Sequence, residues 1–504
     1  MKKTLTGALT IMLLGASIFS CKKTEEVSPT DIENKITDVN DDGKLNILVL
    51  GTSQSINDGS QEFNPSDIAT ELNSILSQDS SLDLEINIVA EDMYKSSIVS
   101  IGFGQGGSIY NWTCEAHSLM QYYYWPEGQS ARWLNLSGKN GNVWDYVVVC
   151  ADPNIVAKMP GYYALGVNKI ASKIVEGGAK VLLLMEWGDD ATIDHYAEYT
   201  YRVADGASVD VETIPAGRAW DALSESKKGD NTIHPTPNGA YVAAASIYSH
   251  LSQQSAAISD YVYDDEIAEI ALVTKNEEDI KTHFSGSVDF SSPFSPCDIS
   301  ASEINYNHTG SSSENGILSG LNWVFGQSNN TLENNGTDPI EFNYGRANTN
   351  FEANKRYNID QSQFQFSFGF PMQDDGSTGN TSMLYGIDKR INNTENGTDL
   401  GAARYMIDNN EIPYARVIPI RTLFAQLLEA MPGQSGYSDS WHMHGNLDKA
   451  SAAYIYTILT GKCALGTEPS DQNSNDWKAW KSKEIGHKTA NTVMTLSGDF
   501  STCD

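Results

Sequence analysis

The chain has 504 residues, 40% of them apolar, so it is long enough for two or three domains with hydrophobic cores. Its formal net charge of −32 would repel a phosphate backbone, which argues against nucleic acid as a partner. Beyond the first twenty residues no stretch is long and apolar enough to cross a membrane, so we expect any anchor to be a lipid.

Residues 1–21 have the layout of a signal peptide, with Lys2 and Lys3 before an apolar run that leads to Cys21. The ending Ile-Phe-Ser-Cys resembles a bacterial lipoprotein cleavage site, which implies a lipid on Cys21 and export to the bacterial envelope, at the outer membrane, facing the periplasm or the surface. An ordinary cleaved signal with an incidental cysteine is the alternative. Residues 22–43 are charged and poor in apolar side chains, as expected of a solvated tether.

Residues 44–255 alternate between runs typical of buried strands and runs typical of helices. The strand-like runs are mostly unbroken Val, Ile and Leu, which is typical of parallel strands covered on both faces; they span residues 45–51, 84–90, 144–151, 179–187 and 209–215. Helical patterns lie between them, and the first has Ser66 as its expected cap. This alternation predicts a doubly wound α/β sheet, whose ligands bind beyond the carboxyl ends of the strands.

Two residues near such strand ends and helix starts could together carry out acyl transfer. Ser53 follows the first strand in "VLGTSQS", and His234 stands in "NTIHP" before the last helix of the unit. A serine can attack a carbonyl group if a neighbouring base takes its proton. We therefore expect Ser53 to be the nucleophile and His234 the base.

These blocks resemble, in order, those of the SGNH or GDSL-like hydrolases. The resemblance implies a flavodoxin-like three-layer α/β/α fold and an esterase, lipase or carbohydrate deacetylase activity without a cofactor or metal. It also implies an oxyanion hole formed by the amides of Ser53 and Gly107, with Gly106 as an alternative, and by the side chain of Asn154. The block around Asn154 departs from the family because no glycine precedes it.

The acid that should orient the histidine is a second departure. The family spacing Asp-x-x-His places Asn231 at the acid position, and Asp230 lies one residue too early. Either residue could contact the imidazole from this loop. A missing carboxylate can lower the rate by several orders of magnitude.

The rest of the chain divides into a charged helical connector at 256–299, a second lobe at 300–465 and a tail at 466–504. The end of the second lobe repeats the end of the first unit, with His442 on His234 and Leu459 on Leu251, which indicates a duplication. We expect "FNYGRANTNFE" to correspond to the strand and turn before Ser53, with Gly345 on Gly51 and no serine at the nucleophile position. The second lobe is then a degenerate SGNH-like α/β unit.

Asp439 and His442 nevertheless have the spacing that the first unit lacks. Either the second lobe is a non-catalytic partner, or this pair assists Ser53 across an interface. The five cysteines besides Cys21 match no zinc pattern, and Cys463 with Cys503 is one conceivable disulfide.

The sequence thus predicts an exported, lipid-anchored serine esterase that removes acyl groups, for example acetyl groups, from small esters or extracellular polysaccharide. A non-catalytic glycan-binding or scaffold lipoprotein on the same fold is the alternative, because a fold does not fix a function.

Overall fold

A computed structural model gives the structure of the chain, and most of residues 36–280 are described. The described residues are 36–52, 55, 67–102, 109–116, 118–125, 128–158, 160–189, 191–228, 236–280, 304–310, 340–346, 364–368, 383–386, 417–418, 420–434, 445–460 and 465–495. Cys21, Cys463 and Cys503 lie outside them, as do the signal and tether before residue 36. In this described part, no helix is long and apolar enough to cross a membrane.

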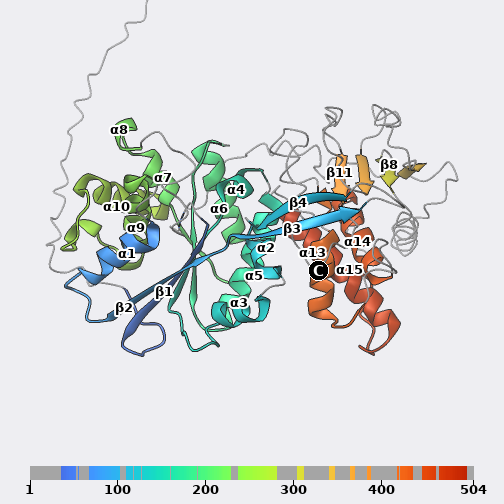
Figure 1. Cartoon of the computed structure of the whole chain (residues 1–504), viewed down its shortest axis with the longest axis horizontal. Helices are drawn as coiled ribbons and strands as arrows, with labels where there is room; N and C mark the ends of the chain where they lie inside the picture. Colours follow the sequence, from blue (N-terminus) through green and yellow to red (C-terminus); the bar gives the residue numbers. More distant parts are fainter. Residues whose placement is uncertain are drawn as a thin grey trace, which may run out of the picture. The chain divides into compact units, whose positions relative to one another are not determined.

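Five parallel strands form the first sheet, in the order β2-β1-β5-β6-β7 (Figure 1). Their bounds are β1 Lys44–Gly51, β2 Glu85–Asp92, β5 Tyr146–Cys150, β6 Lys180–Leu184 and β7 Glu212–Ile214. Without the hairpin between β2 and β5, this is the flavodoxin-like order in which the first strand lies between the second and the third. The predicted α/β fold is confirmed.

Helices cover both faces of this sheet and make the three layers (Figure 1). One face packs against α1 Ile68–Ser77, α7 Ala216–Asp221 and α9 Pro237–Ser252. The other face packs against α2 Leu119–Tyr124, α3 Gln129–Leu136, α4 Pro153–Lys158, α5 Pro160–Val175 and α6 Ile193–Asp205. A short helix, α8 Glu225–Lys228, follows α7. The expected cap of α1 was wrong by one residue, because the carboxylate of Asp67 accepts from the amide of Thr70 at 2.6 Å.

Asp145 joins the amino-terminal segment to the amino end of the sheet. Its Oδ1 accepts from the amides of Val39 and Asn40 at 2.7 and 3.1 Å, and its Oδ2 accepts from the amide of Asn46 at 2.7 Å. Asp145 is completely buried. Three amide donors compensate the desolvation of this carboxylate and hold residues 39–40 beside β1.

A hairpin that the sequence did not reveal stands between β2 and α2. Its strands, β3 Lys95–Gly102 and β4 Ile109–Ala116, pair in antiparallel fashion as a sheet of their own. The segment that contains Gly106 and Gly107 connects them and lies outside the described residues.

The first part of the expected connector belongs to the first unit. Helix α10 Asp265–Ile280 follows the 3₁₀ turn η1 Ala256–Ile258 and packs against α9. Its residues Ile267, Ala268 and Ala271 are buried in the same cluster as α1 and α9. This helix therefore extends the core of the first unit.

A second sheet of five parallel strands follows in the chain, in the order β9-β8-β10-β11-β12. The strands are β8 Ile304–Gly310, β9 Ile340–Arg346, β10 Phe364–Phe368, β11 Met383–Gly386 and β12 Val417–Ile418. Again the first strand lies between the second and the third. The expected match of Gly345 with Gly51 is wrong, because Gly345 lies in β9, which has the edge position that β2 has in the first sheet.

Gly310 is the residue that has the position of Gly51. Gly51 ends β1 and pairs with Asp92, the last residue of β2. Gly310 ends β8 and pairs with Arg346, the last residue of β9. In the sequence, Gly310 is followed by Ser311, Ser312 and Ser313.

In the described stretches after β12 there are three helices, namely α13 Ile420–Ala430, α14 Asn446–Thr460 and α15 Asn475–Thr495. Helix α15 lies in the stretch that the sequence suggested to be a tail. It packs tightly on α14, since a Cβ at Gly486 would lie 2.0 Å from the carbonyl oxygen of Ala450. The indole N–H groups of Trp477 and Trp480 donate to Glu468 and to the carbonyl of Gly466.

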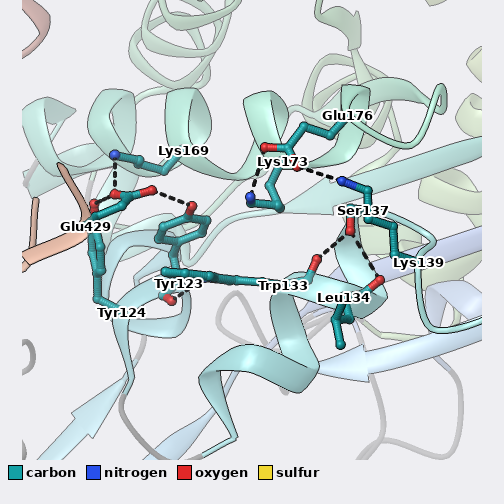
Figure 2. Close-up of polar contacts among 10 residues, drawn as sticks. All are labelled: Tyr123, Tyr124, Trp133, Leu134, Ser137, Lys139, Lys169, Lys173, Glu176 and Glu429. Carbon is teal, nitrogen blue, oxygen red and sulfur yellow. Dashed lines mark hydrogen bonds and ion pairs between the residues drawn. The ribbon is translucent and has the colours of Figure 1, made fainter. Parts of the chain in front are cut away.

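Glu429 of α13 contacts α2 and α5 of the first unit (Figure 2). Its carboxylate accepts from the hydroxyl of Tyr124 at 2.6 Å, from Tyr123 at 3.2 Å and from Lys169 Nζ at 2.7 Å. Burial by itself would raise the pKa of Glu429, but Lys169 and the two tyrosine hydroxyls hold this pKa below its ordinary value.

Candidate functional site

The residues that the sequence predicted to be catalytic lie in gaps between the stretches that the structure describes. Ser53, Gly107, Asp230, Asn231 and His234 all lie outside the described residues. Asn154 lies in α4, and its side chain is outside the description. Asp439 and His442 of the second lobe are outside it as well. The site is therefore described here by the residues next to these positions.

The turn after β1 is held by hydrogen bonds on both sides of positions 53 and 54. The amide of Ser55 donates to the carbonyl of Thr52 at 2.8 Å, which is the spacing of a β-turn. The amide of Ile68, the first residue of α1, donates to the carbonyl of Ser55 at 3.1 Å. Ser55 thus joins the end of β1 to the start of α1.

Glycine is required at position 51 because Ser55 packs against it. A Cβ at Gly51 would lie 2.6 Å from Cβ of Ser55, 2.9 Å from its Oγ and 3.3 Å from Cβ of Cys150. The first of these separations is far shorter than a van der Waals contact. The glycine of the Gly-x-Ser match therefore has a steric reason that involves Ser55.

Four buried polar groups meet at the carboxyl ends of β1, β5 and β6. They are Cys150, Ser55, Asp152 and Glu186, with exposed fractions of 0, 1, 3 and 4%. The hydroxyl of Ser55 lies 3.5 Å from Oε1 of Glu186 and also contacts the thiol of Cys150. We call these four residues the carboxyl-edge cluster.

Glu186 carries a proton at neutral pH. Burial, and after it the negative charge of Asp152, raise the pKa of Glu186 to about 8, although the hydrogen bond from Ser55 acts in the opposite direction. Burial also raises the pKa of the Cys150 thiol well above its ordinary value, so this thiol is neutral as well. The cluster therefore contains an uncharged carboxyl group and an uncharged thiol around one hydroxyl.

Asp152 stands at the beginning of α4. Its backbone carbonyl accepts from the amides of Ile155 and Val156, at 2.9 and 3.1 Å. Asp152 is thus at the N-cap position of a helix whose second residue is Asn154. This places the backbone of Asn154 at the carboxyl end of β5, next to the cluster.

The motif "IPAGRAW" packs α7 against the end of β6. A Cβ at Gly217 would lie 2.5 Å from the carbonyl oxygen of Glu186, and the amide of Gly217 donates to the carbonyl of Met185 at 2.9 Å. Trp220 of α7 stacks on Trp187, with ring centroids 5.5 Å apart and planes at 14°. These contacts fix the segment that carries Glu186.

Glu186 was not predicted from the sequence. A single acidic residue after an apolar run carries no signal of its own, because its partners Ser55 and Asp152 are distant in the chain. Its position one residue beyond "KVLLLM" was the only hint, since side chains at strand ends face the ligand edge of such sheets. Among the described residues, no group of three or more His, Cys, Asp or Glu side chains has a metal-binding arrangement.

No protein family model matches the chain, and no curated protein matches it either. Two solved structures are similar to part of it. One is a candidate SGNH hydrolase from Slackia heliotrinireducens, with 17% identity, 41% of this chain and 98% of that chain covered, and a TM-score of 0.30. The other is a DUF4886 family protein from Bacteroides uniformis ATCC 8492, with 12% identity, coverage of 47% and 95%, and a TM-score of 0.31.

Proposed function

We propose that the chain is a serine esterase of the SGNH type, with Ser53 as nucleophile and His234 as base. The observation that carries the proposal is the position of Gly51-Thr52-Ser53. This stretch begins at the carboxyl end of β1, between β2 and β5, where sheets of this order bind their ligands. His234 lies three residues before the start of α9, which packs on α1 and so belongs to the same unit.

The proposed reaction has two steps. Oγ of Ser53 attacks the carbonyl carbon of an ester while His234 takes the hydroxyl proton, and the proton then passes to the leaving alcohol. Water attacks the resulting acyl-serine with the same histidine as base and releases the carboxylic acid. The amides of Ser53 and Gly107 and the side chain of Asn154 stabilise the negative oxygen that develops in both steps. Asp230 or Asn231 orients the imidazole.

The proposed substrates are O-acyl esters, for example acetyl esters, on extracellular polysaccharide. A lipid on Cys21 would hold the enzyme at the bacterial envelope, next to such polymers. This part of the proposal rests on the signal-like amino terminus and on the resemblance to carbohydrate esterases described above.

Covalent labelling tests the nucleophile directly. A fluorophosphonate forms a stable bond with an activated serine only, so peptide mapping of the labelled protein should find the adduct on Ser53. Ser53→Ala should remove it, and the control Ser77→Ala, at an exposed serine of α1, should leave Ser53 labelled. An unlabelled protein without activity on aryl acetates would overturn the esterase proposal and favour the glycan-binding alternative.

We also propose that residues 304–460 are a second copy of the first unit. The equal strand order, the glycine at the end of the first strand and the repeated Ile-Pro before a helix support this. That dipeptide is Ile214-Pro215 before α7 and Ile418-Pro419 before α13. In this copy Ser312 corresponds to Ser53, and Asp439 and His442 have the family spacing.

The same labelling experiment tests the second copy. An adduct on the peptide with Ser311–Ser313, retained in Ser53→Ala and lost in Ser312→Ala, would give the chain two nucleophiles. Labelling at Ser53 alone would make the second copy a non-catalytic lobe. Labelling at Ser312 alone would move the active site to that lobe.

A further inference from the structure

The carboxyl-edge cluster connects a buried carboxyl group to the turn in which Ser53 stands. Ser55 is fixed at both of its backbone groups, by Thr52 and by Ile68. Its side chain is enclosed by Gly51, Cys150 and Glu186. A displacement of Glu186 would therefore leave a buried hydroxyl short of a partner and loosen this turn.

The surroundings of Glu186 favour its uncharged form. Among the described residues, the titratable groups that interact electrostatically with it are Asp152 at the N-cap of α4, Cys150 of β5 and Tyr163 of α5. None of these is a cation, and Asp152 is an acid in the same buried space. Helix α7 places Gly217 against the carbonyl oxygen of Glu186. An ionised Glu186 would repel Asp152 and would lose most of its hydration, because only 4% of Glu186 is exposed.

We propose that Glu186 is a positioning residue, whose neutral carboxyl group holds Ser55 and thereby the turn that presents Ser53. This inference rests on the proposed function for its catalytic consequence. Ionisation of Glu186 above neutral pH would release the Thr52–Ser55 turn and reduce the reactivity of Ser53. Glu186 touches neither substrate nor the reacting atoms in this scheme, since it acts through Ser55.

The catalytic test compares the pH profiles of the wild type, Glu186→Gln and Glu186→Ala. The amide of glutamine imitates a neutral carboxyl group but cannot ionise. We expect the wild type to lose kcat as the pH rises through about 8, and Glu186→Gln to lack this decrease. Glu186→Ala should lower kcat by about tenfold or more at every pH, with less change in KM. An alkaline decrease that persists in Glu186→Gln overturns the proposal.

Two further measurements need no substrate, so they separate this proposal from the proposed function. The infrared band of a protonated carboxyl group should be present at pH 7, absent in Glu186→Gln, and retained in the control Glu198→Gln, where Arg202 pairs with the carboxylate at 2.6 Å. Hydrogen exchange of the peptide around Ser55 should be faster in the wild type than in Glu186→Gln at pH 9. If the band is missing or the exchange is equal, Glu186 does not position the turn. If both appear without esterase activity, only the proposed function fails.

Discussion

The hydroxyl of Ser55 lies 3.5 Å from the carboxyl group of Glu186, although 131 positions separate the two residues in the chain. Because the pKa of Glu186 rises from 4.5 to about 8 on folding, the folded state binds a proton that the unfolded state has released between these values. The stabilisation of the folded state by this bound proton is complete below pH 4.5 and is lost as the pH rises through about 8. We expect the unfolding free energy to decrease over this window relative to Glu186→Gln.

The difference in unfolding free energy between the wild type and Glu186→Gln should fall by about 1.4 kcal/mol per pH unit in the middle of this pH window. Denaturant unfolding of both proteins at a series of pH values measures it. The difference between them should be flat if Glu186 is ionised in the folded protein throughout. Glu198→Gln is a suitable control for the loss of a buried carboxyl group elsewhere, because Glu198 is paired with Arg202.

Replacing Gly51 by alanine should destabilise the first unit through a clash with Ser55. The new Cβ would lie 2.6 Å from Cβ of Ser55, so either the turn or β1 must shift. We expect a loss of about 1–3 kcal/mol, as for other overpacked cores. In a double-mutant cycle, Ser55→Gly should recover part of this loss, because it removes the atoms that clash. Additive effects of the two changes would show that the contact is not responsible.

The hydrogen bonds of Asp145, which join the amino-terminal segment to the sheet, give a third prediction. Asp145→Asn replaces one acceptor oxygen by an amino group that faces a backbone N–H donor. The loss should be about 2–4 kcal/mol, since buried donors lose a charged partner. Asp42→Asn is the matched control, because Asp42 is exposed and accepts from Lys44 in a local turn; it should change stability by less than about 0.5 kcal/mol. Equal effects of the two substitutions would contradict the role of Asp145.

Figure 2 shows two carboxylates, of Glu429 and Glu176, that each bind a lysine of α5 and should contribute differently to stability. The Glu429 side chain is 30% exposed and accepts from two tyrosines as well as Lys169, whereas the Glu176 side chain is 44% exposed and pairs with Lys139 and Lys173. Glu429→Ala should cost about 1–3 kcal/mol because it removes the partner of the buried Tyr124 hydroxyl. Glu176→Ala should cost about 0–1 kcal/mol. Thermal unfolding at low and high salt measures both, and only the smaller effect should vanish in salt.

The first unit could be predicted from sequence because its strands and helices carry local signals. Runs such as "LNILVLG" and "YVVVC" are apolar throughout, and helices such as α5 end at consecutive glycines. The alternation of strands and helices predicted a doubly wound α/β sheet, and the flavodoxin-like arrangement was implied by the resemblance to the SGNH hydrolases. The hairpin β3–β4 was not predicted from the sequence, because a Gly-rich stretch of six residues, rather than a two-residue turn, connects its strands.

The second unit shows where local signals fail. Strand β8, "INYNHTG", has polar residues at alternate positions and lacks the apolar run of a buried parallel strand. The more apolar β9 was therefore taken for the first strand, and Gly345 for the counterpart of Gly51. The carboxyl-edge cluster escaped for another reason, because its four members are brought together by pairing of β1 with β5 and of β5 with β6.

The reactivity of the buried Cys150 thiol reports on the opening of the first sheet. Its thiol is buried between the turn after β1 and Glu186, so an alkylating reagent can reach it only when β5 separates from its neighbours. The rate at which Cys150 becomes modified under native conditions then measures how often this sheet opens. Peptide mapping distinguishes it from the other cysteines. A substrate or inhibitor that stabilises the turn after β1 should lower the rate of Cys150 modification without contacting the thiol.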